Sequence, residues 1–198
     1  MVREHPVFAR VYDLYMLPQE LWIGERRRRT VGDALGTILE LGVGTGLNFP
    51  LYRKARCVIG IEPDPYMLRR SRARADRARI PIRLIRGAGE ALPFRDGAFD
   101  TVVSTLVFAT ILVPEAAARE LRRVLKPDGR LHFFEHFRSR HPLLARLQDA
   151  VTPMWKRFLG GCEPNRDIVR IFRDAGFEIL ETTKLRGTFL LNGTARPV

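Results

Sequence analysis

The expected fold follows from one segment, Thr37-Ile-Leu-Glu-Leu-Gly-Val-Gly-Thr-Gly-Leu-Asn48. An apolar run at residues 37–41 leads directly into glycines at alternate positions. Such a run is typical of a buried strand, and the glycines let the backbone turn sharply while it passes close to a ligand. A dinucleotide-binding loop would need a glycine where Leu47 stands. Glu40 would also repel a pyrophosphate, so the segment predicts a cationic or zwitterionic ligand at the end of a buried strand.

Alternating strands and helices are expected on the C-terminal side of this segment. Strand patterns occur at residues 57–61, 82–85, 99–104 and 130–137, and helix patterns occur at 64–79, 114–125, 140–158 and 165–175. This alternation predicts a parallel sheet that is covered by helices on both faces. Strand patterns at 177–183 and 188–195 are joined by a short connection, so we expect them to pair as a hairpin that gives an antiparallel edge.

Two short helices are expected on the N-terminal side. Residues 7–17 have a helical apolar pattern that Pro18 should stop, and a second helix should run from about residue 20 to residue 34. Tyr12 and Tyr15 lie on the first helix, where they could fold over a bound ligand or simply pack in the core. We therefore expect residues 1–36 to form a helical lid on a core of residues 37–198, within a single domain of residues 1–198.

Length and composition indicate a globular chain and exclude several classes of protein. The 198 residues are 45% hydrophobic and 28% charged, which excludes a disordered chain. Two cysteines can form neither a disulfide framework nor a four-ligand zinc site, and the sequence shows no clustered set of metal ligands, so no metal is expected. The N-terminus lacks the apolar core of a signal peptide, and no uncharged run approaches the roughly 20 residues that span a bilayer. A cytoplasmic location is the expectation.

The formal net charge of +12 raises the question of an anionic partner. Phosphate backbones favour clusters of basic residues, and such clusters occur at residues 26–29 and 69–79. The second cluster spreads around its expected helix, and no aromatic residue is interleaved that could stack on bases. A solvated helix face is therefore the favoured interpretation, and nucleic acid is not the expected partner. A nucleic-acid-binding protein that retains the fold, and contact of the N-terminal helix with an anionic membrane, are the alternatives.

Three further segments follow the glycine-rich turn in a specific order. Glu62 ends the second expected strand, 20 residues after Gly42, where a carboxylate can accept hydrogen bonds from both hydroxyls of a ribose. Next come Gly87-Ala-Gly-Glu90 and, before the fifth strand, Leu121-Arg-Arg-Val-Leu-Lys-Pro-Asp-Gly129. With these segments in this order, the chain resembles the class I S-adenosylmethionine-dependent methyltransferases over nearly its whole length.

This resemblance implies a Rossmann-like, doubly wound α/β fold, in which a seven-stranded sheet is mostly parallel with an antiparallel last strand and carries an N-terminal helical lid. It also implies S-adenosyl-L-methionine as cofactor and S-adenosyl-L-homocysteine as product. The residues that it would place around the cofactor are Glu40, Gly42, Gly44, Gly46, Asn48, Glu62, Pro63, Met67, Ala88, Gly89, Glu90, Ser104, Thr105 and Leu106. Many members have Asp where this chain has Ala88, so recognition of adenine would fall to backbone groups or to Glu90.

Within that superfamily, the second half of the chain is similar to the methyltransferase-like alkyl thiol S-methyltransferases. The similar segments are Val102-Val-Ser-Thr-Leu-Val107, Phe133-Phe-Glu-His136 and Val151-Thr-Pro-Met-Trp-Lys156. This likeness implies methylation of a small, fairly apolar thiol. Val11-Tyr-Asp13 and the glycine-rich turn are similar to the quinone and phospholipid methyltransferases. The alternative is therefore N-, O- or C-methylation of a phospholipid headgroup, a quinone or a secondary metabolite.

The methyl acceptor is expected near the carboxyl end of the fifth strand. His136 follows that strand, and its ordinary pKa suits proton acceptance, so it is the candidate catalytic base, with a structural histidine as the other interpretation. The helix at about 140–158 is expected to form the acceptor pocket. The walls of this pocket would be Met154, Trp155 and Phe158, together with Tyr12 and Tyr15 of the lid.

Overall fold

The structure, a computed structural model, describes residues 5–158 and 161–198. The helices are α1 (Pro6–Gly32), α2 (Pro65–Ala75), α3 (Pro114–Val124), α4 (Pro142–Phe158) and α5 (Ile168–Asp174), with a short 3-10 helix, η1, at Phe49–Leu51. The strands are β1 (Leu35–Leu41), β2 (Lys54–Glu62), β3 (Ile82–Arg86), β4 (Phe99–Thr105), β5 (Leu125–His136), β6 (Phe177–Lys184) and β7 (Leu190–Pro197). The predicted alternation of strands and helices is confirmed.

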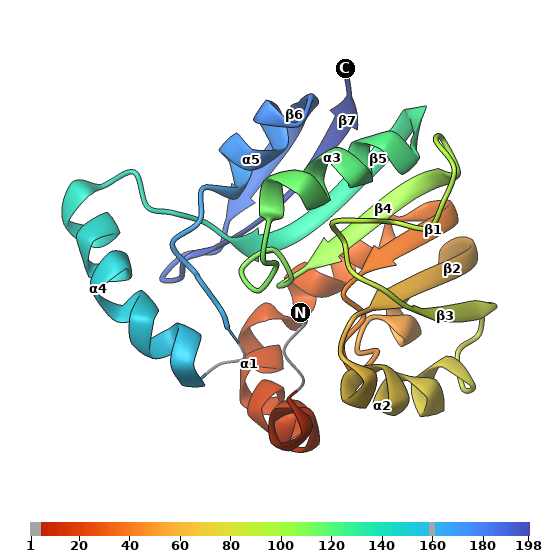
Figure 1. The fold of residues 1–198 in the computed structure, drawn as a ribbon, viewed down its shortest axis with the longest axis horizontal. Coiled ribbons are helices and arrows are strands. Elements are labelled where there is room, and N and C mark those ends of the chain that lie inside the picture. The colour runs from red at the N-terminus through yellow and green to blue at the C-terminus, as the bar shows by residue number, and fades with distance from the viewer. Residues whose placement is uncertain (1–4, 159–160) are drawn as a thin grey trace.

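All seven strands belong to one sheet, in the order β3-β2-β1-β4-β5-β7-β6. The pairs from β3 to β5 are parallel, whereas β7 is antiparallel to both β5 and β6. The expected hairpin of the last two strands is confirmed, because the connection at residues 185–189 is too short for anything but an antiparallel return. The antiparallel strand β7 lies inside the sheet, however, and β6 forms the edge (Figure 1).

Helices cover both faces of the sheet, which makes the fold doubly wound (Figure 1). On one face, α3 and α5 pack over a cluster rich in phenylalanine, in which the rings of Phe108 and Phe172 meet edge to face with their centroids 4.9 Å apart. On the other face, α1 and α2 cover a smaller cluster that includes Val31, Ile38 and Leu68. The central strands β1 and β4 between these layers are largely buried, as their continuous apolar runs predict, whereas β3 and β6 at the two edges are more exposed.

The prediction of two N-terminal helices is wrong, because α1 continues without a break through Pro18. A proline inside a helix removes the hydrogen bond to the carbonyl four residues earlier, here that of Leu14. Both residues are exposed, so water can satisfy this carbonyl. On the opposite side of the helix, Met16 and Ile23 are buried against Phe134 of β5. This packing on both sides of the proline holds the helix in one piece.

Several other boundaries also differ from the prediction by a few residues. Residues 126–129, which we expected before the fifth strand, lie within β5 and form an irregularity in its pairing with β4: Phe99 pairs with Leu125, and Thr101 pairs with Arg130. The strand therefore starts earlier than residue 130. Helix α2 ends at Ala75 rather than at residue 79.

Residues 1–4 of the predicted lid lie outside the described residues. Within residues 5–158 and 161–198, no helix combines the length and the apolar character that crossing a membrane requires.

Candidate functional site

A cavity of about 630 Å³ opens at the carboxyl ends of β1, β2 and β4. The strand order reverses between β1 and β4, and ligands of open α/β sheets bind at such a reversal. The volume lies within the range of about 300–1,000 Å³ that is typical of sites for small molecules. The N-terminal half of α1 covers the cavity, and Lys156 of α4 closes one side together with Gly161, Glu163 and Arg166.

Most of the residues predicted to surround the cofactor line this one cavity. They are Gly42, Gly44, Asn48, Glu62, Pro63, Met67, Ala88, Gly89, Glu90, Thr105 and Leu106, and they are joined by Tyr12 of the lid. The remaining predicted cofactor residues, Glu40, Gly46 and Ser104, are not part of the lining. The acceptor residues His136, Tyr15, Met154, Trp155 and Phe158 do not line it either.

Two glycines of the turn after β1 shape the cavity wall. Gly42 and Gly44 have φ angles of 63° and 55°, in the left-handed region that favours glycine. A Cβ atom on Gly42 would lie 2.7 Å from the side chain of Val107, so any other residue would collide with the loop after β4. A Cβ atom on Gly44 would meet nothing within 4 Å. The turn therefore packs tightly on one side and leaves open space on the other.

Glu62 lies at the end of β2 and fixes the glycine turn from the neighbouring strand. Its Oε2 accepts a hydrogen bond from the backbone N of Gly44 at 2.9 Å, and its Oε1 accepts one from the backbone N of Asp64 at 3.0 Å. Burial raises the pKa of this carboxyl to about 7. Each oxygen has one backbone donor and can accept a second hydrogen bond, so the carboxyl can hold a pair of hydroxyl groups.

Beneath the turn lies a buried polar network that the sequence did not reveal in full. Glu40 accepts hydrogen bonds from Asn48 Nδ2 at 3.0 Å and from the hydroxyl of Tyr52 at 2.7 Å. Burial raises the pKa of Glu40 to about 7. Asn48 also accepts a bond from Arg27 Nη1 at 3.1 Å and donates to Thr105 Oγ1 at 2.8 Å. Glu40 thus acts on the cavity through Asn48, as a positioning residue.

Arg27 brings a buried positive charge from α1 into the cavity wall. Its side chain is 5% exposed, and its Nη2 lies 2.8 Å from Glu20 Oε1 in an ion pair. In the sequence it lies in the basic run of residues 26–29, for which no role in the site is predicted. Arg27 lies four residues after Ile23 and four residues before Val31, so all three share the buried side of the helix. This spacing is the feature of the sequence that could have identified it. A guanidinium in this place can pair with a carboxylate of a bound ligand.

The loop after β4 is held in an unusual backbone conformation. Leu106 has a φ angle of 58°, which residues other than glycine rarely adopt. The buried carboxylate of Glu135 accepts hydrogen bonds from Ser104 Oγ and from the backbone N of Val107 and Phe108, at 2.6, 3.0 and 3.2 Å. Burial raises the pKa of Glu135 to about 7. These bonds compensate for the strained residue and explain why Ser104 sits behind the cavity wall.

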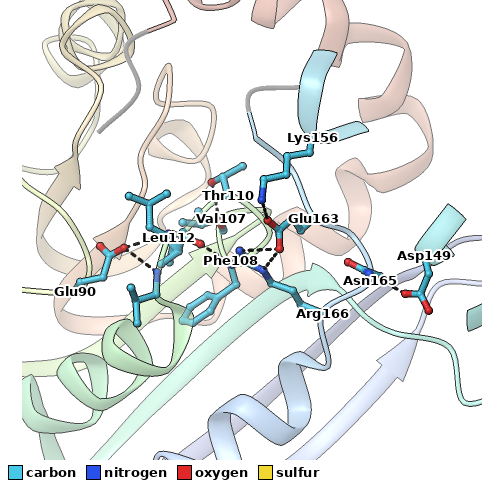
Figure 2. A network of polar contacts seen from close by, with 12 residues as sticks. Glu90, Val107, Phe108, Thr110, Leu112, Asp149, Lys156, Glu163, Asn165 and Arg166 are labelled. Carbon is cyan, nitrogen blue, oxygen red and sulfur yellow. Dashed lines mark hydrogen bonds and ion pairs between the residues drawn. The ribbon is translucent and has the colours of Figure 1, made fainter. Parts of the chain in front are cut away.

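Arg166 holds the same loop from the outside, as Figure 2 shows. Its Nη1 donates hydrogen bonds to the carbonyl oxygens of Phe108 and Ile111, both at 2.6 Å. Glu163 pairs with Arg166 at 3.2 Å and also with Lys156 at the end of α4. This chain of ion pairs connects α4 to the cavity wall.

Glu90 stabilises the far end of that loop. Its Oε1 accepts hydrogen bonds from the backbone N of Leu112 and Val113, at 3.1 and 3.3 Å (Figure 2). The carboxylate is therefore engaged within the protein. Its predicted contact with adenine is left untested, and the backbone of residues 88–89 borders the same part of the cavity.

The lid is fastened to the glycine turn by Asp13 of α1. Its Oδ1 accepts a hydrogen bond from Thr45 Oγ1 at 2.6 Å, and its Oδ2 pairs with Arg70 and Arg74 of α2, at 3.1 and 3.0 Å. Arg74 also donates to the carbonyl of Thr45 at 2.7 Å. Two arginines of the basic cluster on α2 thus serve an internal contact. Nearby, Tyr12 of the lid faces the cavity, and burial raises its pKa to about 12, so it is a hydrogen-bond donor at neutral pH.

His136 is placed differently from the predicted base. Burial lowers its pKa to about 4, and its Nδ1 is buried without a hydrogen-bond partner among the described residues. It does not line the cavity, and a base of such low pKa would take a proton from a neutral acceptor poorly. The base role of His136 stays a prediction that this geometry does not favour.

The acceptor helix also differs from expectation. On α4, Met154 and Phe158 are 55% and 70% exposed, and only Lys156 of this helix lines the cavity. In the described part of the chain, no group of three or more His, Cys, Asp or Glu side chains could hold a metal ion.

Comparisons with known proteins agree with this arrangement. A model of the family described as "Methyltransferase domain" matches residues 39–133. Thiol S-methyltransferase TMT1B of Homo sapiens is 32% identical over 148 residues, which make up 73% of this chain and 61% of the human protein. Phosphatidylethanolamine N-methyltransferase of Cereibacter sphaeroides is 32% identical over 164 residues, 80% of each chain. A solved SAM-dependent methyltransferase from Aquifex aeolicus has the same fold, with a TM-score of 0.72 at 18% identity over 99% of this chain and 100% of its own.

Proposed function

The chain belongs to the class I S-adenosylmethionine-dependent methyltransferases, and on this basis we propose that it methylates a small, fairly apolar acceptor, with a thiol as first choice. The observation that carries the choice of acceptor is the wall of the cavity formed by the loop after β4. Leu106, Val107 and residues 111–113 make this wall apolar. Its two carboxylates, Glu90 and Glu163, are engaged by backbone amides and by ion pairs. The wall suits an acceptor that needs little help from a base.

The cavity also fits the cofactor that the family uses. Glu62 would accept hydrogen bonds from the two ribose hydroxyls, and the open side of Gly44 leaves room for a ligand beside the turn. Arg27 and Asn48 would hold the amino acid end, where the guanidinium can pair with a carboxylate. The segment of residues 87–89 would border the adenine. Bound there, S-adenosyl-L-methionine would supply a methyl group on a sulfonium sulfur.

A thiol suits the acid–base properties of this cavity better than a phenol or an amine. A thiol with an ordinary pKa of about 8.5 is already a few per cent thiolate at pH 7, so it needs no strong base. Burial raises the pKa of Tyr12 to about 12, so its hydroxyl keeps its proton at this pH and is no base for the acceptor. What the chain contributes is an apolar wall that excludes water and a lid that restricts the orientation of the acceptor, and orientation supplies much of the rate of such a displacement.

A second candidate is N-methylation of a phospholipid headgroup. It is supported by the phosphatidylethanolamine N-methyltransferase of Cereibacter sphaeroides, which this chain matches over 80% of both lengths. The chain spans only 61% of the human thiol S-methyltransferase that it matches. Carboxylates at the cavity wall could attract an ammonium group, provided that Glu163 exchanged its partners.

A panel of acceptors tests the proposal. Release of S-adenosylhomocysteine is measured with an alkyl thiol, a phenol, a quinol and phosphatidylethanolamine, all at the same donor concentration. We expect the thiol to react at least ten times faster than the others. A preference for phosphatidylethanolamine or the quinol would replace the thiol by the alternative acceptor. Failure of the protein to bind either S-adenosylmethionine or S-adenosylhomocysteine in calorimetry would refute the methyltransferase activity itself.

A further inference from the structure

Helix α4 packs on the protein with its polar side. Gln148 is buried, its Nε2 donates to the carbonyl of Phe137 at 3.0 Å, and its Oε1 accepts from the backbone N of Ser139 at 2.7 Å. Asp149 pairs with Arg138, and Asn165 donates to the same carboxylate at 2.8 Å (Figure 2). Polar bonds thus fix the helix to the segments before and after it.

The apolar side of α4 faces solvent. Its exposed apolar residues recur every three to four positions and so share one face of the helix. They are Leu143, Leu144, Leu147, Met154 and Phe158, which are 67%, 43%, 54%, 55% and 70% exposed. In an ordinary surface helix the apolar stripe points to the core, so the orientation of this helix is the reverse of the usual one. A contiguous exposed apolar surface of this kind marks an interaction site.

Helix α1 has a similar exposed stripe on the side opposite its buried face. The residues of this stripe are Val7, Val11, Leu14, Leu21 and Trp22, with exposures of 72%, 46%, 73%, 87% and 80%. They share one face over about four helical turns, at the spacing i, i+4, i+7. The buried residues Met16 and Ile23 lie on the other side and hold the helix on β5. The helix is therefore apolar on both sides although only one side meets the protein.

The helices that carry the two stripes, α1 and α4, both border the same cavity. Phe8 and Tyr12 of α1 line this cavity together with Lys156 of α4, and Leu112 and Val113 at its rim are 62% and 50% exposed. Figure 1 shows α4 extending from the body of the fold, with its C-terminal end toward the N-terminal half of α1. Both helices therefore flank the cavity, and each carries its stripe of exposed apolar residues beside it.

Charge identifies the occupant of this surface. Exposed arginines accompany the apolar stripes: Arg10 on α1, Arg146 and Arg157 on α4, and Arg140 just before α4. The acidic residues of these helices are paired internally, Glu20 and Glu25 with arginines of α1 and Asp149 with Arg138. Two copies of a chain of net charge +12 would repel each other across this surface. Apolar side chains flanked by arginines are the pattern of helices that lie in the interface of an anionic bilayer.

We propose that the exposed faces of α1 and α4 dock the protein on the surface of an anionic lipid bilayer, with the cavity entrance facing the membrane. Leucine, methionine and aromatic side chains would enter the boundary between headgroups and acyl chains, and the arginines would contact lipid phosphates. Combined with the proposed function, on which this clause rests, the arrangement lets an apolar acceptor pass from the membrane into the cavity.

Sedimentation with vesicles tests the docking without donor or acceptor. The full chain is mixed with vesicles of phosphatidylcholine alone or with an equal share of phosphatidylglycerol, at low and high salt. We expect binding to the anionic vesicles that weakens with salt and is at least ten times weaker for the double variant Leu147→Glu, Met154→Glu. The matched control is Leu35→Glu. Leu35 is 56% exposed and lies at the amino end of β1, whereas the cavity lies at the carboxyl ends of the strands. This control should bind within twofold of the unchanged protein.

Other outcomes would overturn the docking. The unchanged protein could fail to sediment with anionic vesicles, or the double variant could bind as well as the control. A dimer in sedimentation equilibrium that the double variant dissolves would show that a second copy covers this surface. Circular dichroism checks that the double variant folds, and Leu21→Glu on α1 repeats the test independently if it does not. Because no methyl transfer is measured, loss of the docking would leave the proposed function unaffected.

Discussion

Replacement of Glu62 by glutamine tests the placement of the cofactor most directly. Each carboxylate oxygen of Glu62 accepts one backbone bond, from Gly44 at 2.9 Å or from Asp64 at 3.0 Å, and would accept one ribose hydroxyl. Glutamine turns one of these oxygens into an NH2 group, which cannot accept from either donor. One charge-assisted bond to the ligand is lost, and such a bond contributes about 1.5–3 kcal/mol. Since 1.4 kcal/mol is a factor of ten, the affinity for S-adenosylhomocysteine should fall roughly tenfold to a hundredfold.

The same residue predicts how affinity depends on pH. Burial raises the pKa of Glu62 to about 7, so the free protein is partly protonated there at neutral pH. Hydroxyl donors favour the charged carboxylate, so binding should lower this pKa and release a proton. Affinity should therefore rise as the pH increases from 6 to 8, and the Glu62→Gln variant should lose this rise. Without a ligand, the raised pKa acts in the opposite direction on folding: the stability that this carboxyl contributes below its unfolded pKa of about 4.3 is lost as the pH rises through 7.

Calorimetry at pH 6, 7 and 8 measures both effects. The matched control is Glu163→Gln. Glu163 also lines the cavity, and its pKa lies below its usual range: burial raises this pKa, but Lys156 and Arg166 together lower it by more. Glu163 does not titrate between pH 6 and 8, so this variant should keep the affinity and pH dependence of the unchanged protein. If Glu62→Gln bound the ligand within twofold of the unchanged protein, Glu62 would not hold the ribose.

Three further variants test the lid, the loop and the base. Asp13→Asn removes the ion pairs with Arg70 and Arg74, so donor affinity should fall about threefold to tenfold in calorimetry, whereas equal affinity would show that the lid does not depend on them. Glu135→Gln replaces one of the two accepting oxygens beneath the loop after β4, so the free energy of unfolding should fall by about 1–3 kcal/mol. An unchanged melting temperature would contradict the role given to Glu135. His136→Asn should keep turnover at pH 7 within about threefold, and a loss above tenfold that higher pH reverses would restore the base role.

Much of the fold could be predicted because its signals are local. The buried run before the glycines, the alternation of strands and helices, and the short link before β7 each depend on residues close together in the chain. The two-helix prediction for the N-terminus failed for the opposite reason. Whether Pro18 ends a helix depends on Met16 and Ile23 finding Phe134, which lies more than a hundred residues away in the chain. No local pattern contains that contact.

The same distinction separates the two halves of the site. The predicted cofactor segments follow the ends of consecutive parallel strands, and such ends meet at one edge of a sheet, so the order of the segments in the chain was sufficient to bring them together. For the residues expected to surround the acceptor, no such rule predicts where a helix beyond the fifth strand places its side chains. Met154 and Phe158 were expected in the cavity because their helix follows the fifth strand, yet the polar bonds of Gln148 turn their face of the helix outward.

The amino-acid sequence by itself determined the succession of strands and helices along the chain, the glycine turn after β1 and the carboxylate at the end of β2, because strand propensity, glycine geometry and strand-end position depend on near neighbours. Only the tertiary structure decided that Arg27 enters the cavity, that Glu135 supports the loop after β4 and that α4 shows its apolar side to solvent. Each of these depends on which distant backbone groups and charges a side chain meets after folding, and burial then sets both its partners and its pKa.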